Sequence, residues 1–135
     1  MVGLLIIAHA TYGEALVLCA SHVLGHPLER VAQFGVSVRE DPDALLCRAK
    51  EIVRTLDEGD GVLILTDILG GTPSNIATQL CEPGRIEAVA GVNLPMLVRA
   101  LTYRHEPLAT VVQKAVSGGK EGVVRALPEA QHAAR

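Results

Sequence analysis

Aromatic residues are scarce in this sequence of 135 residues, which contains no tryptophan. Its aromatic residues are Tyr12, Phe34 and Tyr103. The hydrophobic core must therefore consist mainly of Leu, Val, Ile and Ala, a composition that suits helices packed on a sheet and argues against a β-sandwich. The length corresponds to one domain, which is large enough to bury a core without disulfide bonds.

Long apolar runs and clusters of basic residues are also lacking. The longest apolar runs extend over about seven residues, whereas a membrane-spanning helix needs roughly 20. The N-terminus has no basic segment and no small-residue cleavage site, so we expect no secretory signal. The net charge is −3 and the lysine and arginine residues are dispersed. This leaves no basic stripe, and we expect no binding to nucleic acid.

The cysteines form no recognisable motif. Cys19, Cys47 and Cys81 are odd in number and widely spaced, and each lies within a helical pattern. We interpret them as small buried hydrophobic residues in a reducing cytoplasm, without a redox or metal role. We also expect no metal and no cofactor, because no histidine has metal-ligand spacing to Cys, Asp or Glu. The histidines expected at the surface are His22, His26, His105 and His132.

Two apolar runs end in a polar residue. The first covers residues 2–8 and stops at His9, and the second covers residues 61–66 and stops at Asp67. Each run predicts a buried parallel strand that delivers one polar side chain to its carboxyl end. In an open α/β sheet, ligands bind beyond the carboxyl ends of the strands, where the strand order reverses. We therefore expect His9 and Asp67 to share a site.

The rest of the chain alternates between strand and helix patterns. This alternation predicts an α/β fold with a doubly wound, mostly parallel sheet and helices on both faces. If the second strand lies on one side of the first and the third on the other, the switch point falls between the strands that end in His9 and Asp67. The other expected elements are strands over 31–36 and 85–90, and helices over 13–24, from Asp41-Pro42 to a stop at Gly59, and over 72–81, 94–103 and 107–117. The expected buried face of the first helix contains Leu16, Cys19, Ala20 and Val23.

The C-terminal part contains a short β-prone segment over residues 122–127. It follows the pair Gly118-Gly119, which we interpret as flexible. A polar, alanine-rich tail extends over residues 128–135. We thus expect one domain over residues 1–127 and a short tail.

A histidine beside a carboxylate can act as a nucleophile or a base. The carboxylate accepts one ring N–H and fixes the tautomer, which leaves the lone pair of the other nitrogen free. In this arrangement Asp67 would hold His9. Each residue also has a structural interpretation, the histidine as a satisfied polar residue and the aspartate as a turn former before two glycines. Their combination at a switch point favours function.

The glycine turn after the second run predicts an anion site. Gly70 and Gly71 let the backbone approach a ligand closely, and Thr72-Pro73 is expected to cap a helix whose first N–H groups are free. Thr72 and Ser74 are helix-start residues first, with phosphate contacts as a second role. A nucleophilic imidazole beside an anion site suits phosphoryl transfer. The phosphoryl group is not expected to come from a nucleotide, because Gly-x-x-x-x-Gly-Lys is lacking and no Gly-x-Gly-x-x-Gly follows the first strand.

Four stretches resemble a known family. They are the N-terminal strand ending in His9, residues 62–77 (VLILTDILGGTPSNIA), residues 90–97 (AGVNLPML) and residues 119–123 (GKEGV). The stretches around Asp67 and Gly91 are the specific ones. On these residues the chain resembles the enzyme IIA domains of the mannose family of the bacterial phosphoenolpyruvate-dependent sugar phosphotransferase system.

This resemblance implies a phosphotransferase role. His9 would take a phosphoryl group from the histidine-containing phosphocarrier protein and pass it to an enzyme IIB partner, with Asp67 as its hydrogen-bonding partner. The resemblance also implies a homodimer in which the final strand, residues 122–127, is exchanged between subunits and adds antiparallel to the neighbour's sheet, as a fifth, edge strand. Contact with a membrane is then expected only indirectly, through a permease complex.

Two residues depart from the family pattern. Many members have glycine where this chain has Ala10, and serine where it has Thr72; neither change removes a required group. The chain ends soon after Pro128, so we expect the IIB acceptor to be a separate protein. The role in sugar uptake or in regulation stays open.

Three alternatives compete with this interpretation. The phosphoryl-donor subunit of dihydroxyacetone kinase has a similar first domain, although the turn over residues 70–75 looks more like the mannose-type proteins. A two-component receiver domain needs an acidic pair after the first strand to bind magnesium, where this chain has His9-Ala10. A non-catalytic, regulatory dimeric binding module would not need both His9 and Asp67.

Overall fold

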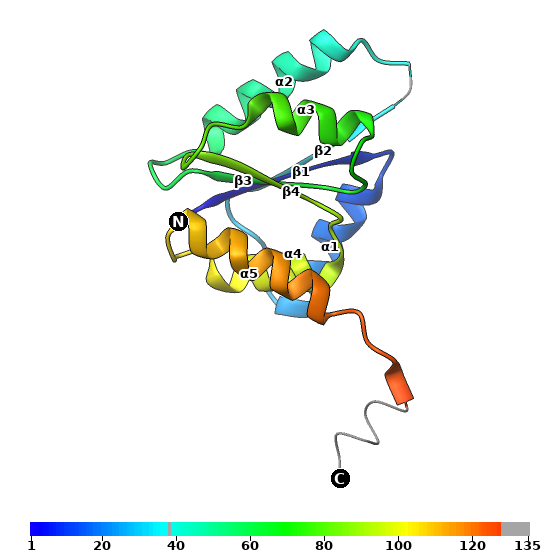
Figure 1. The fold of residues 1–135 in the computed structure, drawn as a ribbon, viewed down its shortest axis with the longest axis vertical. Coiled ribbons are helices and arrows are strands. Elements are labelled where there is room, and N and C mark those ends of the chain that lie inside the picture. The colour runs from blue at the N-terminus through cyan, green and yellow to red at the C-terminus, as the bar shows by residue number, and fades with distance from the viewer. Residues whose placement is uncertain (38, 128–135) are drawn as a thin grey trace.

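Four parallel strands form the centre of the molecule. In the computed structural model, which describes residues 1–37 and 39–127, the strand order is β2-β1-β3-β4 and neighbouring strands are parallel (Figure 1). The elements are β1 (Gly3–His9), α1 (Tyr12–Leu24), β2 (Val31–Val36), α2 (Pro42–Leu56), β3 (Val62–Thr66), α3 (Thr72–Leu80), β4 (Ile86–Ala90), α4 (Leu94–Tyr103) and α5 (Leu108–Glu121). The predicted α/β fold with a four-stranded parallel sheet is confirmed.

Helices cover both faces of the sheet. Figure 1 shows α2 and α3 on one face and α1, α4 and α5 on the other. Side chains of β1 alternate between these layers. Leu4 and Ile6 join a core cluster with residues of α1, α4 and α5, whereas Leu5 and Ile7 join one with residues of α2 and α3. All four are fully buried, which explains why the strand is apolar without interruption.

Helix α1 buries Leu16 and Ala20 as predicted, but not the other two residues of the predicted face. Its buried residues are Gly13, Leu16 and Ala20, whereas Cys19 is exposed and Val23 is 58% exposed. The small residues at positions 13 and 20 lie one above the other on a helix and let α1 approach the sheet closely. That choice of contact face turns Cys19 and Val23 toward solvent.

The cysteines are exposed, so the prediction that they are buried is wrong for Cys19, Cys47 and Cys81. In α2 the buried stripe consists of Leu45, Ala49, Val53 and Leu56. Cys47 lies two residues from Leu45, on the opposite side of the helix. Cys81 lies just past α3, as its C-cap residue.

Helix α2 begins as predicted but ends earlier. The Asp41 side chain accepts a hydrogen bond from the Asp43 N–H at 3.4 Å, as expected of an N-cap. The stop predicted at Gly59 is wrong, because the helix ends with Asp57 as its C-cap. The Asp57 carboxylate accepts hydrogen bonds from the N–H groups of Gly59 at 2.8 Å and Gly61 at 3.2 Å. Asp57 thus organises the turn into β3.

The two glycines predicted to be flexible lie inside α5. Gly118 and Gly119 are buried, and the helix continues to its last residue, Glu121. A Cβ on Gly118 would lie 2.8 Å from Arg99 Cβ, and a Cβ on Gly119 would lie 2.7 Å from Met96 Cε. These glycines let α5 pack closely against α4, so the prediction of a hinge is wrong.

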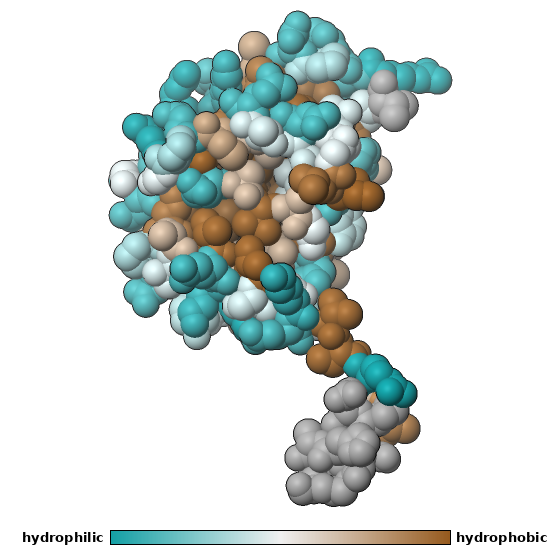
Figure 2. All heavy atoms as spheres, viewed as in Figure 1, coloured by the Kyte–Doolittle hydropathy of each residue, from teal (hydrophilic) through white to brown (hydrophobic). Residues whose placement is uncertain are grey.

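Residues 122–127 do not form a strand in the single chain. Residues 123–125 have no regular secondary structure, and Val123, Val124 and Leu127 are 76%, 71% and 64% exposed. Figure 2 shows an apolar segment that projects away from the end of α5. Pairing of this segment with the sheet of a second copy stays a prediction. The expected tail over residues 128–135 lies outside the described residues.

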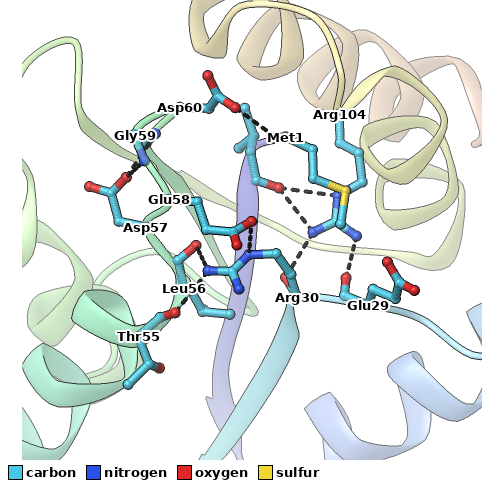
Figure 3. Close-up of polar contacts among 12 residues, drawn as sticks. Met1, Glu29, Arg30, Thr55, Leu56, Asp57, Glu58, Gly59, Asp60 and Arg104 are labelled. Atoms are coloured by element: carbon cyan, nitrogen blue, oxygen red, sulfur yellow. Dashed lines mark hydrogen bonds and ion pairs between the residues drawn. The ribbon is translucent and has the colours of Figure 1, made fainter.

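A buried arginine joins three segments at the amino-terminal edge of the sheet (Figure 3). Arg104, 5% exposed, donates hydrogen bonds to the carbonyl oxygens of Val2 at 2.9 Å, Glu29 at 2.5 Å and Arg30 at 2.7 Å. Burial and the nearby positive charge of Arg30 lower the pKa of Arg104, against the opposing effect of Glu29. These bonds tie the starts of β1 and β2 to the end of α4. The sequence pattern did not predict this contact.

Candidate active site

His9 and Asp67 meet at the carboxyl edge of the sheet. Strand β1 lies between β2 and β3, and His9 is its last residue, in register with Val36. Asp67 directly follows β3, whose last residue, Thr66, pairs with Ile7. The strand order therefore reverses between β1 and β3, as predicted. The two side chains come together because these neighbouring parallel strands end at the same edge.

A single carboxylate oxygen holds His9 at two points. Asp67 Oδ2 lies 2.8 Å from His9 Nδ1 and accepts the backbone N–H of His9, also at 2.8 Å. Asp67 Oδ1 accepts the N–H of Ile68 at 2.8 Å. Because the carboxylate can only accept, Nδ1 carries the ring proton and Nε2 keeps a free lone pair. The predicted geometry of the pair is therefore present.

Asp67 is held in its charged form. Burial would raise the pKa of its carboxyl group, but hydrogen bonds from the His9 backbone, the His9 ring and the Ile68 backbone outweigh burial and lower the pKa. The Asp67 side chain is 15% exposed, whereas that of His9 is 46% exposed. The site thus presents an accessible imidazole backed by a negative charge.

A left-handed turn directs the chain after His9. Ala10 has φ +49°, a conformation that favours glycine, and its N–H donates a hydrogen bond to the Val36 carbonyl at 3.1 Å. A Cβ on Gly35 would lie 2.2 Å from the Ala10 carbonyl oxygen. Sequence reasoning missed Gly35, although a glycine inside a strand is a signal of close backbone approach.

The glycine turn lies against the reactive side of the imidazole. Gly70 has φ +92° and completes the turn after Asp67. Gly71 has an ordinary φ of −83°, but a Cβ on it would lie 3.1 Å from His9 Cε1 and 3.6 Å from Nε2. The nitrogen that is free for chemistry therefore faces Gly71.

Helix α3 begins beside this nitrogen. Its N-cap is Gly71, with no side-chain cap and no acidic residue in the first turn, so the prediction that Thr72 caps the helix is wrong. The Asn75 N–H bonds to the Gly71 carbonyl at 3.0 Å. The N–H groups of Thr72 and Ser74 precede this first helical bond and lack helical partners. Such groups, together with the helix dipole, attract an anion.

The loop between β4 and α4 is hydrogen-bonded to the backbone at Asp67. The Gly91 N–H donates to the Asp67 carbonyl at 2.8 Å, and the Val92 N–H donates to the Thr66 carbonyl at 2.9 Å. The Tyr12 hydroxyl donates to the Val92 carbonyl at 2.8 Å. The supporting role of these residues was not predicted, although Gly91 stood in a specific family stretch.

Comparison with known protein families shows which family the chain belongs to. Residues 3–116 match the EIIA-man family, described as the PTS system fructose IIA component. The chain belongs to this family. The resemblance predicted from residues 62–77 and 90–97 is therefore confirmed, and the chain is a IIA-type component of a phosphotransferase system.

Two curated relatives give the extent of the match. The mannose-specific EIIAB component of Escherichia coli K12 is 33% identical over 125 residues, which cover 90% of this chain and 38% of the relative. The fructose-specific EIIA component of Bacillus subtilis 168 is 30% identical over 105 residues, which cover 77% of this chain and 71% of the relative. The EIIA-man chain thus spans well under half of the E. coli protein.

Solved structures share the architecture of this EIIA-man domain. A phosphotransferase component EIIA from Streptococcus agalactiae superposes with a TM-score of 0.82 at 26% identity and covers 93% of this chain and 97% of its own. A mannose/sorbose-specific IIA subunit from Enterococcus faecalis also has a TM-score of 0.82, at 21% identity, over 92% of this chain and 93% of its own. At 21% identity, the similarity to the E. faecalis subunit shows a shared fold.

Within residues 1–37 and 39–127, no three side chains of His, Cys, Asp or Glu come together as a metal site. In the same ranges no helix has the length and hydropathy needed to cross a membrane.

Proposed function

We propose that His9 is the phosphoryl acceptor of this EIIA-man domain. It receives the group from the histidine-containing phosphocarrier protein and passes it to an enzyme IIB partner. One observation carries the proposal: Asp67 Oδ2 holds His9 Nδ1 at 2.8 Å, and Gly71 leaves the opposite side of the ring open.

The transfer step follows from this geometry. The lone pair of His9 Nε2 attacks phosphorus, a new N–P bond forms, and the N–P bond of the donor phosphohistidine breaks with its electron pair left on the donor imidazole. The proton on Nδ1 stays in place. The His9 ring gains positive charge as the bond forms, and the Asp67 carboxylate stabilises that charge. The same step in reverse delivers the group to IIB.

The anion site stabilises the transferred group. We assign this role to Gly70, Gly71, Thr72 and Ser74, whose backbone lies at the start of α3. The phosphoryl oxygens carry negative charge in the transition state, and the free N–H groups of the first helical turn are positioned to receive it. The domain supplies no basic side chain from residues 70–75, so binding of free phosphate is expected to be weak.

The surface beside His9 suits a protein partner. In the loop after Asp67, Ile68 and Leu69 are 63% and 80% exposed. Tyr12, at the start of α1, is 41% exposed. Exposed apolar side chains of this size around a reactive residue are typical of a surface that another protein covers. We propose that the phosphocarrier protein and IIB both dock here.

A second copy of the chain is part of the proposal. Strand β4 is an edge strand, and Figure 2 shows apolar surface between the layers of α3 and α5, where β4 lies. Residues 122–127 supply a β-prone, exposed segment that pairs with no strand among residues 1–37 and 39–127. Antiparallel pairing of this segment with β4 of a second copy would cover both surfaces.

Phosphorylation in a reconstituted relay tests the proposed function. The chain is incubated with phosphoenolpyruvate, enzyme I and the phosphocarrier protein, and its intact mass is measured. We expect one acid-labile phosphoryl group, which disappears in His9→Gln while the circular dichroism spectrum is unchanged. Stoichiometric labelling of folded His9→Gln, or an acid-stable label on Thr72 or Ser74, would overturn the proposal.

A further inference from the structure

A cavity lies at the end of the sheet opposite to His9. It is formed where α2 and α3 end and β4 begins, and its volume is about 490 Å³. His9 stands at the carboxyl edge of the sheet, beside Thr72 at the start of α3, whereas the cavity includes Leu80 at the end of that helix. The nine residues of α3 separate the two places by roughly 13 Å. The cavity is therefore distinct from the candidate active site.

The floor of the cavity is apolar. Val53, Leu80 and Ile86 line it, and each is at least 94% buried and belongs to the core cluster under α2 and α3. This floor offers a hydrophobic contact to the carbon body of a ligand. A volume of a few hundred cubic ångströms is in the range of small-molecule sites, roughly 300–1,000 Å³.

The rim of the cavity carries an excess of positive charge. Lys50 and Arg54 reach it from α2, and Arg85 reaches it from the start of β4. Two carboxylates, Asp57 and Glu82, also line the cavity. The excess is local, because the whole chain has a net charge of −3.

The carboxylate of Asp57 is already paired with groups of the protein. Its carboxylate accepts the N–H groups of Gly59 and Gly61 and contacts Arg85 Nε at 3.1 Å; Figure 3 shows it turned toward Gly59. The Gly59 hydrogen bond, with those of Gly61 and Arg85, lowers the pKa of Asp57 against the effect of burial. Only Nε of Arg85 is used in this contact, so its two terminal nitrogens keep N–H donors that a ligand can use.

The other two cations are also available. Arg54 pairs with Glu51 on its own helix at 2.6 Å, but both side chains are about 70% exposed, and such surface pairs are weak. Lys50 has no ion-pair partner among the described residues. Three positive groups therefore line the cavity beside its apolar floor, and the carboxylate of Glu82 is the negative group that lines it besides Asp57.

We propose that this cavity binds a small organic phosphate monoester. The phosphate dianion contacts Lys50, Arg54 and the terminal nitrogens of Arg85, and the carbon body lies on Val53, Leu80 and Ile86. Arginine forks and a lysine ammonium suit a phosphate, which offers oxygens in several directions. The apolar floor selects an ester over inorganic phosphate.

Titration with phenyl phosphate, followed by amide chemical shifts of the labelled full chain, tests the site. We expect saturable shifts in residues 50–57 and 79–86, with a Kd on the order of 1 mM for a ligand of this size. Inorganic phosphate, phenol and benzoate should each bind at least about fivefold more weakly, since each lacks one part of the recognised chemistry. Any of the three binding as tightly as phenyl phosphate, or no saturable shift, would overturn the proposal.

Two variants locate the bound phosphate. Arg54→Gln and Lys50→Gln should each weaken phenyl phosphate binding by about fivefold, the usual effect of one exposed charge contact. Arg48→Gln is the matched control, because Arg48 lies on the same helix and also pairs with a glutamate, Glu40, but does not line the cavity. Equal affinity in Arg54→Gln, Lys50→Gln and Arg48→Gln would contradict the proposal.

Two further measurements separate the cavity from the active site. His9→Gln should leave the shifts in residues 79–86 unchanged, whatever happens to shifts in residues 70–75. In a Cys19→Ser, Cys47→Ser protein, phenyl phosphate should slow alkylation of Cys81, which lines the cavity. Burial and the charge of Glu87 raise the pKa of this thiol, so alkylation is measured at alkaline pH. Unprotected Cys81 at saturating ligand would count against the site.

Discussion

Gly71 lies against the His9 ring so closely that a Cβ on it would be 3.1 Å from Cε1 and 3.6 Å from Nε2. The backbone of Gly71 is in an ordinary extended conformation, with φ −83° and ψ 175°. Glycine is therefore needed here for space and not for an unusual φ. We propose that the space left beside Nε2 by the missing Cβ of Gly71 accommodates the phosphoryl group.

Gly71→Val should block phosphoryl transfer without unfolding the domain. The branched side chain would occupy the space beside Nε2, and displacement of the reacting atoms by about 1 Å costs about 100-fold in rate. Gly71→Ala should have a smaller effect in the same direction. Rates are measured in the reconstituted relay and the fold by circular dichroism. A folded Gly71→Val protein with the wild-type rate would show that phosphate does not pass this side of the ring.

Asp67→Asn should slow phosphorylation without abolishing it. The amide oxygen can still accept the Nδ1 proton but does not supply the negative charge that balances the developing imidazolium. We expect a loss of about 10- to 1,000-fold in rate, against complete loss in His9→Gln. Single-turnover labelling with the phosphorylated phosphocarrier protein measures both. An unchanged rate in Asp67→Asn would remove Asp67 from the mechanism.

Ala10→Gly should stabilise the domain by about 0.5–1 kcal/mol. Ala10 has φ +49°, a conformation in which an L-residue is strained by about 1–2 kcal/mol. Glycine removes this strain, but its larger conformational entropy in the unfolded state offsets part of the stabilisation. Ala15→Gly is the matched control, because Ala15 is exposed within α1 and should be destabilised by about 1 kcal/mol. Urea unfolding of both variants checks the opposite signs.

Asp57→Asn should destabilise the domain in a pH-dependent manner. Its carboxyl pKa in the folded state is below the ordinary value of 3.8, so its stabilisation is fully present above about pH 4 and is lost as the pH falls through the folded-state pKa. At pH 7 we expect a loss of about 1–2 kcal/mol. The urea midpoints of the wild-type protein and of Asp57→Asn should therefore differ less at pH 3 than at pH 7. Asp41→Asn, which keeps a good N-cap, should show little change at either pH.

Removal of residues 123–135 should convert the proposed dimer into a monomer. Truncation after Gly122 keeps α5 intact, including the buried Gly118 and Gly119, so loss of association would reflect the segment and not the helix. Light scattering and sedimentation at micromolar concentration measure the mass of both forms. A full chain that is already monomeric under these conditions would contradict the exchanged strand.

The two apolar runs were sufficient to predict the central strands, the switch point and the His9–Asp67 pair. The reason is that side chains at the carboxyl ends of neighbouring parallel strands lie close to each other, and this does not depend on which helices cover the sheet. The helix patterns predicted which segments are helical for a similar reason, since each must bury some apolar face. Residues 62–77 and 90–97 added the family.

The contact faces and the ends of helices required the folded chain. Cys19 and Val23 turn outward because Gly13 and Ala20 set how α1 meets the sheet, and no pattern within α1 selects between these faces. Gly118 and Gly119 read as a hinge in isolation, but they are buried against Arg99 and Met96, and that contact keeps them helical. Glycine permits either outcome, so the long-range neighbour decides.

The polar contacts around the site were also invisible in the linear pattern. Gly91 and Val92 donate to the backbone of Asp67 and Thr66 from another loop, about 25 residues away along the chain. The cavity rim likewise collects Lys50, Arg54 and Arg85 from separate elements. Hydrophobic periodicity reports which side of an element is buried, whereas the partner of each donor, acceptor and charge depends on distances that arise only when the elements pack.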